Sequence, residues 1–161
     1  MFRIGSGIDF HEFAKTPPVN GHIKIGGVGV AHKFALIGHS DADVVLHALV
    51  DALLGAIGAG DIGEHFPPSD NKWKGADSEI FVKHAMSLLQ NKGASIGNAD
   101  ITIIAEYPKI SPYKPQIKSN VARLLGVDGQ RVGIKATTTE GMGFIGRGEG
   151  LGAMASVLVL I

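Results

Sequence analysis

Residues 39–55 read HSDADVVLHALVDALLG, and this stretch predicts a loop followed by an apolar helix. The polar residues 39–43 can cap the helix, and Ser40 or Asp41 is the expected cap. The helix itself, Val44 to Gly55, consists mainly of valine, alanine and leucine. A helix with so few polar side chains is buried on nearly all sides, so it must pack inside the protein against other elements.

Strand and helix patterns lie on both sides of this central helix. Arg3 to Phe10 predicts a strand, and apolar positions around Gly26-Gly27 predict a hairpin or bulged pair. Strands and helices follow one another without the regular spacing of βαβ units. We therefore expect an α/β protein of the α+β type, with a mixed sheet and helices packed on one face. The other expected elements are helices over 77–92, capped by Asp77, and 115–125, and strands over 99–105, 132–138 and 151–160.

Length and composition limit the class of protein. The 161 residues suit a single domain spanning 1–161. Fifteen basic residues balance fifteen acidic ones, so no broad positive field exists to hold nucleic acid or a membrane, and any phosphate binding must be local. The start of the chain lacks a signal-peptide pattern, and no apolar run approaches the roughly 20 residues of a membrane span. We expect a cytoplasmic protein, without excluding a plastid form.

Asp9-Phe10-His11 at the end of the first strand is a candidate metal site. Residues two apart in a strand point to the same side, so the Asp9 carboxylate and the His11 imidazole can reach one ion. The chain has no cysteine, which leaves histidine and carboxylate as the available metal ligands. Taken alone, the pair favours ordinary surface polar chemistry over a metal site.

His47 is the candidate third ligand, because it interrupts the apolar helix. A buried histidine without a partner is costly, so either a metal or a polar neighbour must satisfy it. Asp43 and Asp51 lie four residues to either side and could orient a ligating imidazole. One carboxylate and two imidazoles would leave a fourth tetrahedral position open, as in catalytic zinc sites.

The segment KATTTEGMGFIGRGEG, residues 135–150, is a candidate phosphate site. Its threonines offer hydroxyl and backbone donors, Arg147 offers a guanidinium fork, and Glu140 could hold magnesium beside them. The alternative is a plain strand end with a glycine loop. The segment also contains the spacing G-x-G-x-x-G, but more glycine and a strand follow instead of a helix, so we reject a dinucleotide site.

Three further segments are weaker candidates. His39-Ser40 precedes the apolar helix and could contact a phosphate, although the segment taken alone favours helix capping by Ser40 or Asp41. Asp61-Ile62-Gly63 and residues 66–70 resemble turns whose carboxylates could bind sugar hydroxyls. Residues 105–111 lie just past a strand, where backbone groups can contact a ligand or simply form a surface loop.

The ordered set of motifs resembles the 2-C-methyl-D-erythritol 2,4-cyclodiphosphate synthase family. The motifs are D-F-H, H-S-D-A-D-V-x-x-H-A-L-x-D-A-L-L-G, G-D-I-G-x-x-F-P, A-D-S, K-A-T-T-T-E and G-R-G-E-G. The similarity runs from Arg3 almost to Ile161. Each fragment is weak by itself, but their order is highly specific.

This resemblance implies a set of roles. Zinc would bind Asp9, His11 and His47, and magnesium or manganese would be reached through Glu140 and the substrate diphosphate. His39 and Thr138 would be catalytic, stabilising the transition state. The family is a homotrimer whose sites lie between subunits. The implied substrate-binding residues are Asp9, His11, His39, Ser40, Asp61, Ile62, Gly63, Phe66, Pro67, Ser69, Asp70, Ala105, Lys109, Ile110, Ser111, Thr137, Thr138, Thr139, Glu140, Phe144 and Arg147.

The implied reaction belongs to the non-mevalonate route to isoprenoid precursors. The 2-phosphate of 4-diphosphocytidyl-2-C-methyl-D-erythritol 2-phosphate attacks the β-phosphorus, CMP leaves, and a cyclic diphosphate forms. Two departures from the family pattern affect substrate contacts: Pro68 replaces a carboxylate, and Ile110-Ser111 replaces two larger apolar residues. Two rival hypotheses are a metal-dependent phosphohydrolase and a trimeric nucleotide- or metal-binding module without turnover.

Overall fold

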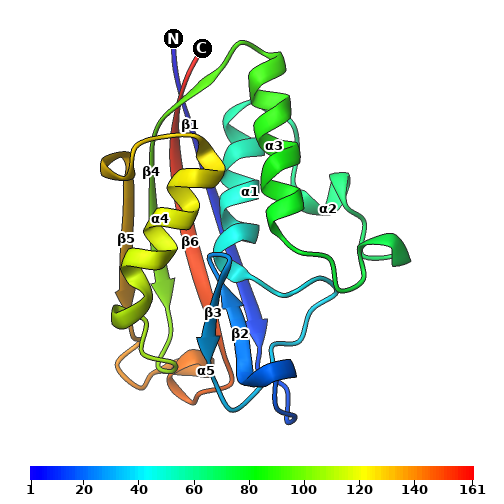
Figure 1. Ribbon diagram of the computed structural model, residues 1–161, viewed down its shortest axis with the longest axis vertical. Helices are drawn as coiled ribbons and strands as arrows, with labels where there is room; N and C mark the ends of the chain where they lie inside the picture. Colours follow the sequence, from blue (N-terminus) through cyan, green and yellow to red (C-terminus); the bar gives the residue numbers. More distant parts are fainter.

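A mixed sheet forms one layer of the protein, whose computed structural model describes residues 1–161 (Figure 1). The strand order is β1-β6-β4-β5. Strands β4 and β5 are parallel, whereas β6 runs antiparallel to both of its neighbours. The mixed sheet expected from the sequence is therefore confirmed. The strands are β1 (Phe2–Glu12), β4 (Ser95–Ile104), β5 (Val132–Thr137) and β6 (Gly150–Leu160).

Three long helices lie on one side of this sheet (Figure 1). They are α1 (Val44–Ala56), α3 (Glu79–Asn91) and α4 (Lys114–Leu125). Helices α1 and α4 pack against its strands, and α3 packs against the other two helices. A separate hairpin of β2 (His22–Ile25) and β3 (Val28–Ala31) turns at Gly26-Gly27, as expected. The loops around residues 58–74 and 140–150 contain two short helices that the sequence did not predict. These are α2 (Ile62–His65) and α5 (Gly143–Gly146), and three-residue 3-10 turns occupy Val19–Gly21, Asn71–Trp73, Ser111–Tyr113 and Gly129–Arg131.

The central helix α1 is buried almost completely, as its composition predicts. Its cap, however, is Asp43 and not Ser40 or Asp41. The wholly buried Asp43 carboxylate accepts hydrogen bonds from the amides of Val45 and Leu46, and also from Gly26 and Gly27 in the hairpin turn. One side chain thus caps α1 and attaches the hairpin to it. Burial raises the pKa of Asp43 despite these donors.

Helix α1 lies directly against strand β1, and two glycines make this close approach possible. A Cβ atom at Gly5 would lie 1.8 Å from the carbonyl oxygen of Ala52, and one at Gly7 would lie 2.0 Å from that of Ala48. Gly7 precedes Asp9 by two residues on the same side of the strand. The glycines therefore set the distance between the two elements that carry the candidate metal ligands.

Replacing Gly7 by alanine is expected to destabilise the protein by about 3 kcal/mol, because the added methyl group must push α1 away from the sheet. The matched control is Gly55→Ala, since a Cβ atom there meets nothing closer than 4.0 Å. The control should be neutral or slightly stabilising in the helix. Urea unfolding measures both, and equal stability of the two variants would contradict the close packing.

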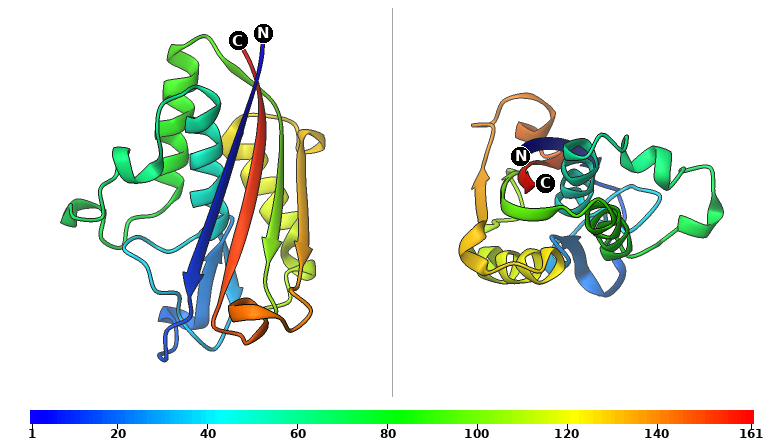
Figure 2. Two further views of the ribbon diagram at one scale, coloured as in Figure 1. Left: turned by 180° about the vertical axis from the view of Figure 1, so that it is seen from behind. Right: turned by 90° about the horizontal axis from the view of Figure 1, so that it is seen from above.

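The opposite face of the sheet carries no long helix, and only the short α5 lies at one end of it (Figure 2). Alternate side chains of the two neighbouring strands β1 and β6 point outwards there, and several are large and apolar. Ile4 is 76% exposed, Ile8 53%, Phe10 42% and Met154 51%. An apolar sheet face of this kind is typical of an interaction surface. No helix of the protein is long and apolar enough to span a membrane.

Candidate metal centre and pockets

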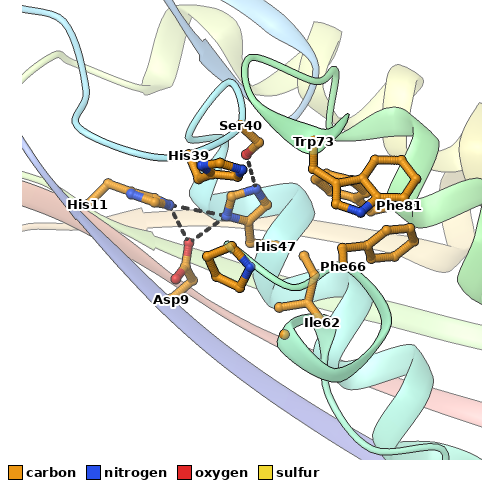
Figure 3. A pocket seen from close by; sticks show the side chains of 11 residues that line it. Asp9, His11, His39, Ser40, His47, Ile62, Phe66, Trp73 and Phe81 are labelled. Atoms are coloured by element: carbon orange, nitrogen blue, oxygen red, sulfur yellow. Dashed lines mark hydrogen bonds and ion pairs between the residues drawn. The ribbon is translucent and has the colours of Figure 1, made fainter. Parts of the chain in front are cut away.

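Asp9, His11 and His47 meet at one point between β1 and α1 (Figure 3). The Oδ2 atom of Asp9 lies 3.0 Å from Nε2 of His11 and 3.1 Å from Nδ1 of His47. The two imidazole nitrogens are 3.1 Å apart. The alternation of β1 brings the first two side chains to the helix side of the sheet, and His47 faces them from the first turn of α1.

The geometry and chemistry of this triad fit a divalent metal. Tetrahedral bonds of about 2.0–2.1 Å place ligand atoms about 3.3 Å apart, close to the separations found here. The donors are one carboxylate oxygen and two imidazole nitrogens, a set that zinc accepts. The triad is partly open to the adjoining pocket, which leaves room for a further ligand.

The charges of the triad depend on one another. Burial raises the pKa of Asp9, but hydrogen bonds and the charges of His11 and His47 outweigh it, so the pKa lies below its ordinary value. Burial lowers the pKa of His11, but the contacts with Asp9 dominate and the pKa is raised. A bound cation would replace the histidine protons as the partner of the Asp9 carboxylate.

The expected partners of His47 were wrong. Asp43 caps the helix, and the Asp51 carboxylate accepts a hydrogen bond from the amide of Ile62. Neither reaches the imidazole. Nε2 of His47 instead lies 2.9 Å from the hydroxyl oxygens of both Ser40 and Ser78. Helical spacing placed the two aspartates correctly on one stripe, but strong backbone donors at the helix ends attract their carboxylates.

A pocket of about 320 Å³ adjoins the triad (Figure 3). It contains several of the predicted substrate-binding residues from the segments 39–40, 61–63 and 66–70. Pro68 lies on its wall, and the aromatic residues Trp73 and Phe81 line it without having been predicted. The pocket residues are Asp9, His11, His39, Ser40, His47, Ile62, Gly63, Phe66, Pro68, Trp73 and Phe81.

Other predicted residues near this pocket have local structural partners. The Asp61 carboxylate accepts a hydrogen bond from the Glu64 amide and so caps α2. Asp70 accepts a hydrogen bond from the Lys72 amide, while its carbonyl oxygen lies 3.1 Å from Nε2 of His39. Pro67 and Ser69 are exposed on the loop between them.

A second pocket, of about 370 Å³, lies at the ends of β4 and β5. It brings together two segments predicted separately, residues 105–111 and the threonines after β5. Glu106 joins them, because its Oε1 atom accepts hydrogen bonds from the Thr139 amide and hydroxyl and from the Gly141 amide. The amide of Gly141 above all lowers the pKa of Glu106. The pocket residues are Ala105, Glu106, Pro108, Lys109, Ile110, Ser111, Ala136, Thr137, Thr138 and Glu140.

Two more predicted residues lie outside both pockets. Arg147 is exposed and pairs with Glu149, with Nε 2.8 Å from Oε1. This ion pair raises the pKa of Arg147 and lowers that of Glu149. Phe144 packs edge-on against Phe10, with ring centroids 5.6 Å apart.

Within one chain the two pockets remain apart. The metal ligands Asp9 and His11 lie on β1, at one edge of the sheet, and Thr137 ends β5 at the other edge. Strands β6 and β4 lie between them. This separation could not be predicted from the sequence, because strand order depends on long-range pairing.

The fold and the triad define a mixed α/β protein with a candidate metal centre beside a partly apolar pocket. The chain belongs to the YgbB family, whose profile matches residues 2–160. It is 54% identical over 157 residues to the 2-C-methyl-D-erythritol 2,4-cyclodiphosphate synthase of Xylella fastidiosa, covering 98% of this chain and 87% of that relative.

Solved structures share the same fold. A bifunctional IspDF of Campylobacter jejuni is 40% identical, with a TM-score of 0.92, and the alignment covers 99% of this chain and 42% of that one. A CDP complex of IspF from Plasmodium falciparum is 34% identical, with a TM-score of 0.85 over 99% of this chain and 96% of the other. The family identified from the motifs is therefore confirmed.

Proposed function

We propose that this chain is a 2-C-methyl-D-erythritol 2,4-cyclodiphosphate synthase, a cytoplasmic lyase of the non-mevalonate isoprenoid pathway. It converts 4-diphosphocytidyl-2-C-methyl-D-erythritol 2-phosphate into the cyclic diphosphate and CMP. The observation that carries the proposal is the convergence of Asp9, His11 and His47 beside a pocket, in a chain 54% identical to a relative of that name. The second pocket receives the cytidine.

The reaction requires positioning more than side-chain nucleophilicity. The 2-phosphate is already largely ionised at neutral pH, since its second pKa is about 6, so it attacks without a general base. The protein must fold a flexible substrate so that the attacking and leaving oxygens lie in line. His39 and Ser40 contact the phosphates from the first pocket, and Thr138 does so from the second.

The residues that would hold metal ions account for the charge that the site needs. Asp9, His11 and His47 would hold zinc, and Glu140 would hold magnesium or manganese. When bound, these ions supply the positive charge that a triply phosphorylated substrate requires. Among the residues proposed to contact substrate, only Lys109 and Arg147 carry a fixed positive charge, and the net charge of the chain is zero.

We further propose a homotrimer whose active sites lie between subunits. The separation of the two pockets on opposite edges of the sheet supports this. One substrate molecule that contacts both kinds of pocket must bind between two copies of the chain. The apolar face of β1 and β6, which no long helix covers, supplies a surface on which copies can pack. Each site would then take its zinc ligands from one chain and its cytidine pocket from the next.

The form of the second product distinguishes this proposal from its closest rival. A cyclase gives one CMP and a cyclic diphosphate, whereas a metal-dependent phosphohydrolase consumes water and gives linear products, with CMP or inorganic phosphate released according to the bond that is cleaved. The non-enzymatic rival, a binding module, would hold CDP and release nothing. Chromatography of the reaction mixture with zinc and magnesium present separates the three outcomes.

Replacing Glu106 by alanine is expected to raise KM about tenfold, with a smaller change in kcat. The carboxylate joins the two halves of the second pocket through three hydrogen bonds, and its loss should loosen the pocket that binds substrate. The matched control is Glu64→Ala, a glutamate outside both pockets. Steady-state kinetics test the prediction, and an unchanged KM would remove Glu106 from the organisation of the pocket.

A further inference from the structure

The buried Ser78 has an unusual position. It immediately precedes helix α3, where serine side chains commonly cap the helix. Yet its hydroxyl makes no capping hydrogen bond, and the Asp77 carboxylate accepts the hydrogen bond from the Glu79 amide. Ser78 has no exposed surface and does not line the pocket. Its hydroxyl must therefore have hydrogen-bond partners other than the helix backbone or a substrate.

Two neighbours are these partners. The Ser78 hydroxyl donates a hydrogen bond to Oδ1 of Asp41, and the Ser78 amide donates to Oδ2 of the same carboxylate at 3.0 Å. Asp41 can only accept when ionised, so the single hydroxyl proton points towards it. The Ser78 oxygen then presents a lone pair to Nε2 of His47, which lies 2.9 Å away.

We propose that Asp41 and Ser78 are positioning residues for the metal centre. Because the Ser78 oxygen acts as an acceptor, the proton of His47 resides on Nε2, and Nδ1 is left as the ligating nitrogen. Nδ1 is the atom that faces Asp9 and His11. The chain Asp41–Ser78–His47 thus fixes both the tautomer and the orientation of the imidazole.

Ser40 has a different part in this arrangement. Its hydroxyl also lies 2.9 Å from Nε2 of His47, but it lines the pocket and is only partly buried. Ser40 can therefore turn towards a substrate phosphate, while Ser78 remains the permanent partner of His47. The imidazole keeps its orientation when substrate enters.

The test measures zinc binding directly, by competition with a chromophoric chelator. Ser78→Ala is expected to bind zinc 10- to 100-fold more weakly than the parent chain, which is the usual effect of removing such a partner. Asp41→Asn should weaken binding about tenfold by the same route. The control is Ser87→Ala on the same helix, whose exposed hydroxyl bonds only to the carbonyl of His84. It should bind zinc as the parent does.

A spectroscopic readout separates positioning from general destabilisation. In the zinc-loaded parent, nitrogen-15 NMR should show Nε2 of His47 protonated and its proton in slow exchange. That signal should broaden or vanish in Ser78→Ala. The inference would be overturned if Ser78→Ala bound zinc as tightly as the parent and showed the same His47 signal. If Ser78→Ala does not fold, a zinc affinity of Asp41→Asn equal to that of the parent would overturn it.

The inference rests on the proposed function only for the presence of a divalent ion. The two can fail separately. A parent chain that binds zinc but forms no cyclic product would refute the synthase, and the variants would still report on Asp41 and Ser78. Conversely, a fully active parent with unaffected variants would refute the positioning role alone.

Discussion

His47→Ala is expected to lower turnover by about 10³-fold or more, because a bound metal supplies several kcal/mol of transition-state stabilisation. His47 is one of only three protein ligands in the triad, and its ring is held on both nitrogens. Zinc content should fall in parallel with activity. Elemental analysis of the purified protein and initial-rate kinetics measure the two effects.

The matched control for this variant is His22→Ala. His22 is exposed on the hairpin, and its ring contacts only the carbonyl oxygen of Asn20. It should keep both zinc and activity. Full turnover by a zinc-free His47→Ala chain would refute the role of the triad.

Mixing two inactive variants should restore activity, if sites are shared between subunits. His47→Ala damages the metal half of a site, and Glu140→Ala damages the nucleotide half. When the two chains are unfolded, mixed in equal amounts and refolded together, random assembly gives an intact site at about a quarter of the interfaces, since each interface needs one undamaged half from each chain. Activity should therefore recover to about a quarter of the parent level.

Two controls make this experiment decisive. Each variant refolded alone should remain inactive, and the mixture should sediment as a trimer. A trimeric mixture without activity would show that both halves of a site come from the same chain. Such a result would contradict the arrangement inferred from the opposite edges of the sheet.

The sequence predicted most of the fold, because the relevant signals are local. The apolar composition of Val44 to Gly55 and the alternation of the first strand are visible without any partner. The short helices α2 and α5 were missed, since only four residues form each and loop glycines obscure them. The helix cap was misassigned because the Asp43 carboxylate also accepts hydrogen bonds from the hairpin turn. That contact joins residues distant in the chain, so the sequence pattern does not reveal it.

The three candidate metal ligands could also be predicted from local sequence signals. Asp9 and His11 share a side of one strand, and His47 stood out as a polar residue in an apolar helix. The partners of His47 could not be found in this way. Ser78 lies 31 residues away, just before another helix, so no periodicity connects it to the triad. The role of Glu106 likewise depends on two loops that meet only in the folded protein.

Phosphorus-31 NMR of the purified protein with 4-diphosphocytidyl-2-C-methyl-D-erythritol 2-phosphate, zinc and magnesium tests the proposed function most directly. The proposal predicts that the substrate resonances disappear together, replaced by those of CMP and of two coupled phosphorus atoms in an eight-membered cyclic diphosphate. Removal of both metals with a chelator should stop the reaction. A linear product, with or without inorganic phosphate, would contradict the account.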